Sequence, residues 1–132
     1  MLCRAYFEVQ RMQLQLKVVQ LLLNNKKQKQ WIEKILLDSI RRKSYLESII
    51  DTSKFKIISG PLHLLALTPI NYTSSQAYKW SIKTRNSLLA NNFMLSRPMY
   101  GDRYYLKAVM GNPNTKFEDL NLLANLINHS IT

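Results

Sequence analysis

Residues 101–123 read GDRYYLKAVMGNPNTKFEDLNLL, so a strand pattern, a turn and a helix pattern follow one another directly. Side chains alternate in character across Tyr104–Met110, and a period of two residues is typical of a β-strand. Gly111–Asn114 has the composition of a tight turn. Thr115 and Glu118 have the spacing of a capping box, which predicts the start of a helix. The apolar residues of this helix recur at helical spacing, namely Leu120, Leu123, Ala124 and Ile127.

Further strands are predicted upstream of this stretch. Phe55–Ser59 and Leu62–Leu67 are short runs of β-type composition, separated by a Gly-Pro turn. Pro69 is predicted to end the second run, because proline cannot donate a backbone hydrogen bond. Phe93–Ser96 is a candidate for another short strand.

A helix is predicted between these strands. Thr73 and Gln76 form a second capping box, in which the two side chains satisfy each other's free backbone N–H groups. Asn91 and Asn92 are predicted to end the helix, because asparagine tolerates the left-handed conformation of a C-terminal turn. The face predicted to be buried carries Tyr78, Ile82 and Leu89.

The N-terminal part has the pattern of two helices. Residues 5–24 carry apolar side chains on more than one face, which indicates burial or a partner. Residues 24–30 (NNKKQKQ) are predicted to form a polar break, and a second helix is predicted from about Trp31 to Ile50. Its apolar stripe consists of Ile32, Ile35, Leu36, Ile40, Tyr45, Leu46, Ile49 and Ile50. The order α-α-β-β-α-β-β-α predicts an α+β fold, with connecting and packing helices in residues 1–52 and an α/β small domain in residues 53–132.

Composition limits the class of protein. The chain has 132 residues, the size of one domain with a real core. Its 46% apolar and 20% charged residues argue against disorder of the whole chain. The net charge of +11 favours an anionic partner. Only three glycines are present, which argues against a complete phosphate-gripping enzyme.

The cysteine count and the hydropathy pattern bear on the cellular compartment of the protein. Cys3 is the only cysteine, so an internal disulfide is excluded, and with His63 and His129 it gives no zinc-ligand spacing. The longest apolar stretch, Ile57–Ile70, is short and interrupted by glycine and proline, so no membrane span is predicted. No signal peptide is recognised, and the sequence predicts a cytoplasmic protein.

Two basic clusters allow different interpretations. Lys26, Lys27 and Lys29 form one, and Arg41–Lys43 forms the other. Charge runs of this kind are most often solvated helix faces. The alternative is a small basic module that binds nucleic acid or another polyanion. No recognised nucleic-acid-binding motif accompanies the clusters, and this disfavours the alternative.

Lys107 is the single candidate site residue. His63, placed between two leucines without a catalytic partner, is interpreted as structural, and no Walker loop or carboxylate pair is present. Alternation puts Lys107 on one face of its strand with Tyr105 and Val109. A lysine buried there without a partner would be costly. Either that face is hydrated, or Lys107 points at an anionic ligand.

The stretch from Leu106 onward resembles the C-terminal signature of the group II pyridoxal-phosphate (PLP)-dependent amino-acid decarboxylases. This group includes the glutamate, cysteine-sulfinate, aromatic-amino-acid and diaminobutyrate decarboxylases. The matching elements are Leu106-Lys107, Asn112-Pro113, Thr115 and Glu118–Leu120. Upstream, Arg11 with Leu16–Val18 and the segment Ser44–Ile49 resemble two of the family's helices, so the resemblance runs from about residue 9 to the end.

The resemblance implies a small, mainly antiparallel sheet covered by helices, in a C-terminal domain that helps close the active site. It implies that PLP belongs to the intact enzyme and that the Schiff-base lysine and other cofactor contacts lie in a large domain N-terminal to the matched region. No catalytic, cofactor-binding or metal-binding residue is therefore expected here, and the chain alone is expected to be inactive. Lys107 falls where glutamate-type relatives carry an active-site arginine, so a substrate-facing role is implied.

Partners are expected as well. The resemblance implies the first, which is the missing large domain or a companion chain. A homo-oligomer, in the simplest case a dimer, is also expected through the apolar segment 12–23, whose side chains need a partner. No membrane partner is expected, and nucleic acid remains the disfavoured alternative.

Overall fold

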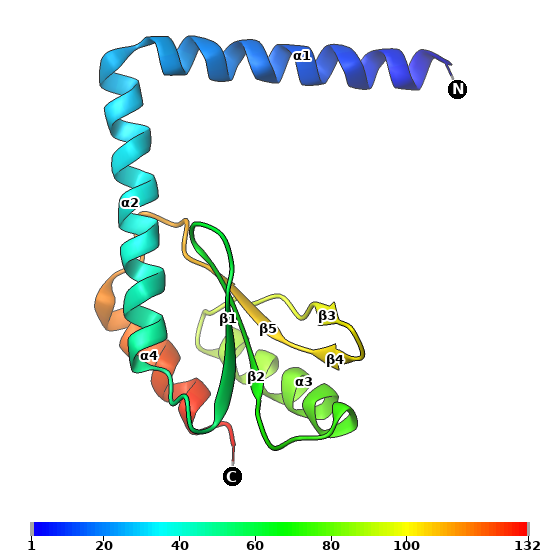
Figure 1. The fold of residues 1–132 in the computed structure, drawn as a ribbon, viewed down its shortest axis with the longest axis vertical. Coiled ribbons are helices and arrows are strands. Elements are labelled where there is room, and N and C mark those ends of the chain that lie inside the picture. Colours follow the sequence, from blue (N-terminus) through cyan, green and yellow to red (C-terminus); the bar gives the residue numbers. More distant parts are fainter. Residues whose placement is uncertain (1, 132) are drawn as a thin grey trace. The chain divides into compact units, whose positions relative to one another are not determined.

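The computed structural model describes the backbone of residues 2–131 and the side chains of residues 9–21 and 24–131. Two compact units are present, one up to Ile35 and one from Leu36 onward. The elements in chain order are α1 (Leu2–Asn24), α2 (Lys26–Ile49), β1 (Phe55–Ser59), β2 (Leu64–Pro69), α3 (Ser74–Ala90), β3 (Met99–Tyr100), β4 (Arg103–Tyr104), β5 (Leu106–Val109) and α4 (Phe117–Asn128) (Figure 1). The predicted α+β class is confirmed.

The predicted polar break at residues 24–30 is wrong, because only Asn25 separates α1 from α2. The side-chain Oδ1 of Asn25 accepts a hydrogen bond from the backbone N–H of Lys27 at 3.1 Å, as an N-cap residue does. The backbone carbonyl of Asn25 accepts from the N–H of Lys29 at 2.8 Å. Lysine and glutamine are good helix formers, so this polar run extends α2 instead of forming a loop.

The sheet of the C-terminal unit is antiparallel, with the strand order β1-β2-β5. Its register aligns Ile58 of β1 with Ala66 of β2, and Ala66 with Lys107 of β5. Because side chains alternate along each strand, Leu67 and Leu106 belong to the opposite face. The predicted antiparallel sheet is confirmed.

One face of this sheet contributes to the core together with helices. The second half of α2 supplies Leu46, α3 supplies Trp80 and Leu88, and α4 supplies its whole apolar stripe. The rings of Phe55 and Trp80 lie 5.8 Å apart in this core. The buried residues of α4 are the four predicted ones, Leu120, Leu123, Ala124 and Ile127.

The ends of α3 are as predicted, but its buried face is not. The Thr73–Gln76 capping box is formed, with hydrogen bonds of 3.3 and 2.8 Å, and Asn92 has a left-handed φ of 65°. The face predicted from Tyr78, Ile82 and Leu89 is wrong, since Tyr78 and Leu89 are exposed. The residues that are buried are Ala77, Trp80, Ser81, Thr84 and Leu88. Trp80 sets this face because its large ring fills the core.

The predicted strand at Phe93–Ser96 is not formed. Only Ser96 makes an isolated bridge, to Lys107. The hairpin of β3 and β4 follows instead, and Gly101 at its turn has φ +64°, a conformation that favours glycine. The predicted strand Tyr104–Met110 is interrupted at Tyr105, whose backbone N–H bonds to the carbonyl of Pro98 at 3.0 Å.

The predicted capping box of α4 is displaced by one residue. Lys116, not Thr115, is the N-cap, and the Asp119 carboxylate accepts from its backbone N–H at 2.9 Å. A lysine side chain has no acceptor, so only this half of a capping box is formed. Thr115 belongs to the preceding turn, where its N–H bonds to the carbonyl of Asn112 at 3.2 Å.

Candidate functional site

Lys107 lies in the middle of β5, between the buried residues Leu106 and Ala108. Its side chain belongs to the face of the sheet opposite to the core, and it is partly exposed. The register places it in one row with Ala66 and Ile58 of the neighbouring strands. The sequence-predicted alternation of β5 is therefore confirmed for the residues around Lys107.

A pocket of about 230 Å³ opens beside Lys107. It is lined by Ile58, Gly60, Pro61, Leu64, Leu65, Ala66, Tyr100 and Lys107. Seven of these residues lie in the paired strands β1, β2 and β5 or in the β1–β2 turn, whereas Tyr100 lies in the β3–β4 hairpin. The only charged residue of the lining is Lys107, so the pocket suits a ligand that joins an anionic group to an apolar body.

The ammonium group of Lys107 is free within the described part of the chain. No carboxylate or other acceptor among residues 9–21 and 24–131 forms an ion pair or side-chain hydrogen bond with it. Apolar neighbours such as Ile58 and Ala66 line the pocket beside this charge. The substrate-facing role of Lys107 stays a prediction.

The residues of this pocket do not fit PLP as a whole. A PLP site needs a carboxylate for the pyridinium nitrogen and a cradle of backbone groups for the phosphate, and the lining offers no carboxylate. Gly60 is not part of a cradle, since a Cβ there would lie 2.9 Å from the Cβ of Leu64, so it allows close packing of the hairpin. Among the described residues, no group of three His, Cys, Asp or Glu could hold a metal ion.

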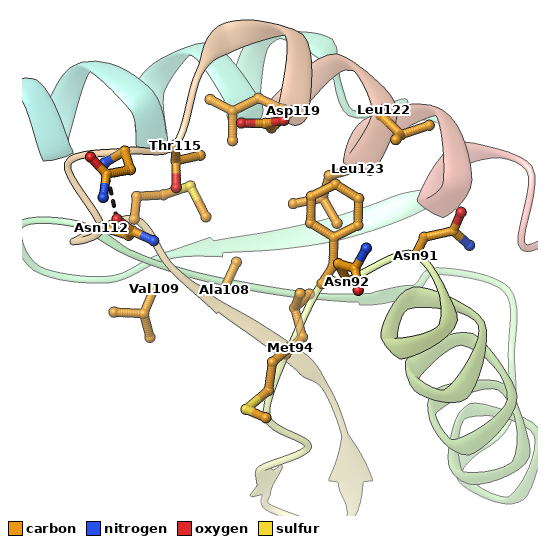
Figure 2. A pocket seen from close by; sticks show the side chains of 15 residues that line it. Asn91, Asn92, Met94, Ala108, Val109, Asn112, Thr115, Asp119, Leu122 and Leu123 are labelled. Carbon is orange, nitrogen blue, oxygen red and sulfur yellow. Dashed lines mark hydrogen bonds between the residues drawn. The ribbon is translucent and has the colours of Figure 1, made fainter.

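A second pocket, which the sequence did not indicate, lies between the end of α3, the end of β5, the following turn and α4 (Figure 2). Its volume is about 640 Å³, and asparagines surround an apolar floor. Two of these asparagines have local partners: Asn112 accepts from the N–H of Asn114 at 2.9 Å, and Asn91 donates to the Ser87 carbonyl at 2.9 Å. The one charged group of the lining, the Asp119 carboxylate, accepts from the Lys116 N–H, so the lining does not identify a ligand.

Arg42 is a buried structural residue, although the sequence placed it in a basic cluster. It is 6% exposed, and its Nε and Nη2 donate to the Met110 carbonyl at 3.1 and 2.9 Å. Nη2 also donates to the hydroxyl of Ser39 at 3.1 Å. The predicted stripe of α2 is thus wrong in part, because Leu36 is exposed whereas Ser39 and Arg42 are buried.

The neighbours of Arg42 have different surroundings. Arg41 is exposed and forms an ion pair with Asp38 at 3.2 Å. The Nζ of Lys43 donates to the hydroxyl of Ser59 at 3.0 Å and also to the Gly60 carbonyl. Arg41–Lys43 therefore does not form one basic patch, and no observation favours the polyanion-binding alternative.

The histidine interpreted as structural has packing contacts. The backbone carbonyl of His63 accepts from the N–H of Met110 at 3.0 Å. The side chain of His63 packs close to Gly111, where an added Cβ atom would lie 3.5 Å from Nε2. The Nδ1 atom is buried and has no hydrogen-bond partner among the described residues.

The side chain of Cys3, predicted to be inert, lies outside the described residues. No described helix is long and apolar enough to cross a membrane.

Comparison with known proteins finds no matching family model and no matching curated protein. Solved structures do match. Oryza sativa TDC, solved with PLP and tryptamine, has a TM-score of 0.65 at 11% identity, over 74% of this chain and 22% of that one. Catharanthus roseus tryptophan decarboxylase has a TM-score of 0.61 at 16% identity, over 74% and 21%. Mouse CSAD has a TM-score of 0.61 at 17% identity, over 74% and 24%.

These matches show a shared fold. The chain spans about a fifth of the length of the solved structures it matches. The resemblance to the group II decarboxylases, stated from the sequence, is thereby confirmed at the level of the fold.

Proposed function

We propose that this chain is the C-terminal portion of a PLP-dependent amino-acid decarboxylase, which helps close and shape the active site without supplying the catalytic large domain. The observation that carries the proposal is the coincidence of two likenesses. The order of motifs from Leu106 to Leu120 resembles that family. The fold is similar to about a fifth of each of three solved chains, one of which is named as a tryptophan decarboxylase.

In this proposal Lys107 attracts the carboxylate of the substrate. Its free ammonium group, its position on the face away from the core and the apolar pocket beside it support the role. Tyr100 at the rim of the pocket limits the space for the rest of the substrate. Residues that hold a substrate in one orientation lower the entropic part of the barrier, so this chain would contribute by positioning.

The cofactor would be held by a companion part of the enzyme, because the pocket residues of this chain do not fit PLP. The sheet face that carries Lys107 is the surface that would meet this companion. Exposed apolar side chains beside Lys107, such as Ile58, Val109 and Tyr100, support a partner there. We place the protein in the cytoplasm, as its single cysteine predicts.

The test begins with the DNA upstream of the coding sequence. The proposal expects an in-frame or adjacent reading frame that encodes a His-Lys cofactor motif. Co-expression of both products should then yield a complex that retains PLP through gel filtration. The absence of such a reading frame, or a companion that never co-purifies with this chain, contradicts the proposal.

Variants of that complex test Lys107. Lys107→Ala should raise KM for an acidic substrate at least about tenfold, because a charge-assisted contact is lost. The matched control is Lys79→Ala, which removes an exposed lysine of α3 that is not part of the pocket lining. Equal kinetic constants in the two variants would contradict the role of Lys107.

A further inference from the structure

A third pocket, of about 290 Å³, lies between the second half of α3 and the end of α4. Its lining from α3 consists of Lys83, Thr84, Ser87 and Leu88. Its lining from α4 and the two residues after this helix consists of Asn125, Leu126, His129 and Ser130. Both sets have the spacing i, i+1, i+4, i+5, which gathers side chains on one side of a helix. We infer that this pocket binds a phosphate group, as inorganic phosphate or on a small phosphate monoester.

The polar groups that α3 contributes to this pocket lack acceptors. Thr84 is only 4% exposed, and its hydroxyl forms no hydrogen bond with another residue in the described part of the chain. The exposed hydroxyl of Ser87 and the ammonium group of Lys83 have no side-chain hydrogen bond or ion pair there either. Because buried polar groups are normally hydrogen-bonded, the unpaired Thr84 hydroxyl points to an acceptor that enters from the pocket.

The carbonyl acceptors at the end of α4 are already occupied. The Asn125 carbonyl oxygen accepts from the backbone N–H of His129 at 3.1 Å and lies 2.8 Å from the ring Nδ1. The Ile127 carbonyl accepts from the N–H and the hydroxyl of Ser130, at 2.9 and 2.6 Å. The same hydroxyl accepts from Nε1 of Trp80 at 2.8 Å. The pocket is therefore left with more free donors than free acceptors.

The charges of the pocket also favour an anion. Lys83 is the only permanently charged residue of the lining, which contains no carboxylate. The eight acidic residues of the sequence all lie outside α3 and outside the last two turns of α4. A carbonyl oxygen can only accept, so the contact with Asn125 places a proton on Nδ1 of His129 and leaves Nε2 for a ligand.

The arrangement of the donors favours phosphate over a carboxylate. The donors come from two helices and so approach from different directions. A phosphate group has three or more strong acceptor oxygens that point in different directions, whereas a carboxylate has two oxygens in one plane. The volume lies at the lower end of the range for small-molecule sites, and Leu88 and Leu126 offer apolar contacts to a small organic group. The inference is independent of the proposed decarboxylase function.

The experiment is an NMR titration of the full, isotope-labelled chain with inorganic phosphate at constant ionic strength. Phosphate should shift the amide signals of residues 83–88 and 125–130 and the ring signals of His129, in a saturable way. Acetate should bind at least about tenfold more weakly, because it offers fewer acceptors. Phenyl phosphate distinguishes the two sources of the phosphate group: a dissociation constant below that of inorganic phosphate indicates a monoester, and one that is no lower indicates the free ion.

Variants separate a built site from general attraction by the net charge of +11. Lys83→Ala should raise the dissociation constant of phosphate at least about tenfold, because a charge-assisted contact is lost. The matched control Lys79→Ala removes an exposed lysine one turn earlier in α3, outside the lining, and should raise it less than about twofold. Thr84→Val removes only the hydroxyl and should raise it at least about threefold, with the fold checked by circular dichroism.

Three results would overturn the inference. The first is the absence of saturable binding of phosphate. The second is acetate binding as tight as that of phosphate. The third is an equal loss of affinity in Lys83→Ala and Lys79→Ala, which would show that the ion responds only to the overall positive charge of the chain.

Discussion

The helices α1 and α4 both contain many apolar residues, yet they use them differently. In α4 the apolar residues form one stripe, from Leu120 to Ile127, and this stripe is buried in the C-terminal unit. In α1 the apolar residues form two stripes, and every position from Val9 to Leu21 is exposed. One stripe lets a helix complete a core within its own chain, whereas two opposed stripes leave it dependent on a partner.

The largest expected effect tests this difference with one substitution in each helix. Leu123→Ala in α4 removes a side chain that is 2% exposed, so the free energy of unfolding of the C-terminal unit should fall by about 2–5 kcal/mol. Leu16→Ala in α1 should change it by less than about 0.5 kcal/mol. Urea unfolding followed by the fluorescence of the buried Trp80 measures both, with the exposed Trp31 replaced by Phe. Equal losses would contradict the contrast.

A smaller effect repeats the contrast within α2. Arg42→Ala leaves the buried carbonyl of Met110 without its two hydrogen bonds, which should cost about 1.5–3 kcal/mol of unfolding free energy. Arg41→Ala removes only an exposed ion pair with Asp38 and should cost less than about 1 kcal/mol. The same urea titration compares them. If Arg41→Ala proved the more damaging, the assignment of Arg42 as the structural residue would fail.

These two arginines also illustrate how far the sequence could be interpreted. Features that depend on neighbours in the chain were predictable: the strands β1 and β2, the stripe of α4, and the Thr73–Gln76 capping box. Three consecutive basic residues look alike in the sequence. Only the approach of Met110, which lies 68 residues beyond Arg42, distinguishes it from Arg41.

The candidate site was predictable to the same extent. Alternation along one strand was enough to place Lys107 on a face away from the core. Its pocket depends on the register with Ala66 and Ile58 and on the β3–β4 hairpin that brings Tyr100. The hairpin was missed because Tyr105 interrupts a run that looks like one strand. Long-range pairing of this kind leaves no local pattern in the sequence.

The helices α3 and α4 differ in their N-terminal caps. Two threonine substitutions test this difference, with a moderate expected effect on the free energy of unfolding. Thr73→Ala removes a hydroxyl that accepts from the N–H of Gln76, and should cost about 1 kcal/mol of unfolding free energy. Thr115→Ala should cost much less, because Lys116 is the N-cap of α4. Thermal unfolding compares the two variants. A loss at Thr115 as large as at Thr73 would restore the sequence-predicted capping box.

The smallest expected effect concerns the turn after α2, in the C-terminal unit. The Ser53 hydroxyl, followed by its backbone N–H, holds the pKa of the Asp51 carboxyl below its ordinary value of 3.8. A lowered carboxyl pKa contributes stability that is present above 3.8 and is lost as the pH falls through the lower folded-state value. Ser53→Ala should raise this pKa toward 3.8 and reduce the loss of stability in acid, while the backbone contact persists. Carbon-detected NMR titration of Asp51 measures the shift, and a wild-type carboxyl that titrates at 3.8 would contradict it.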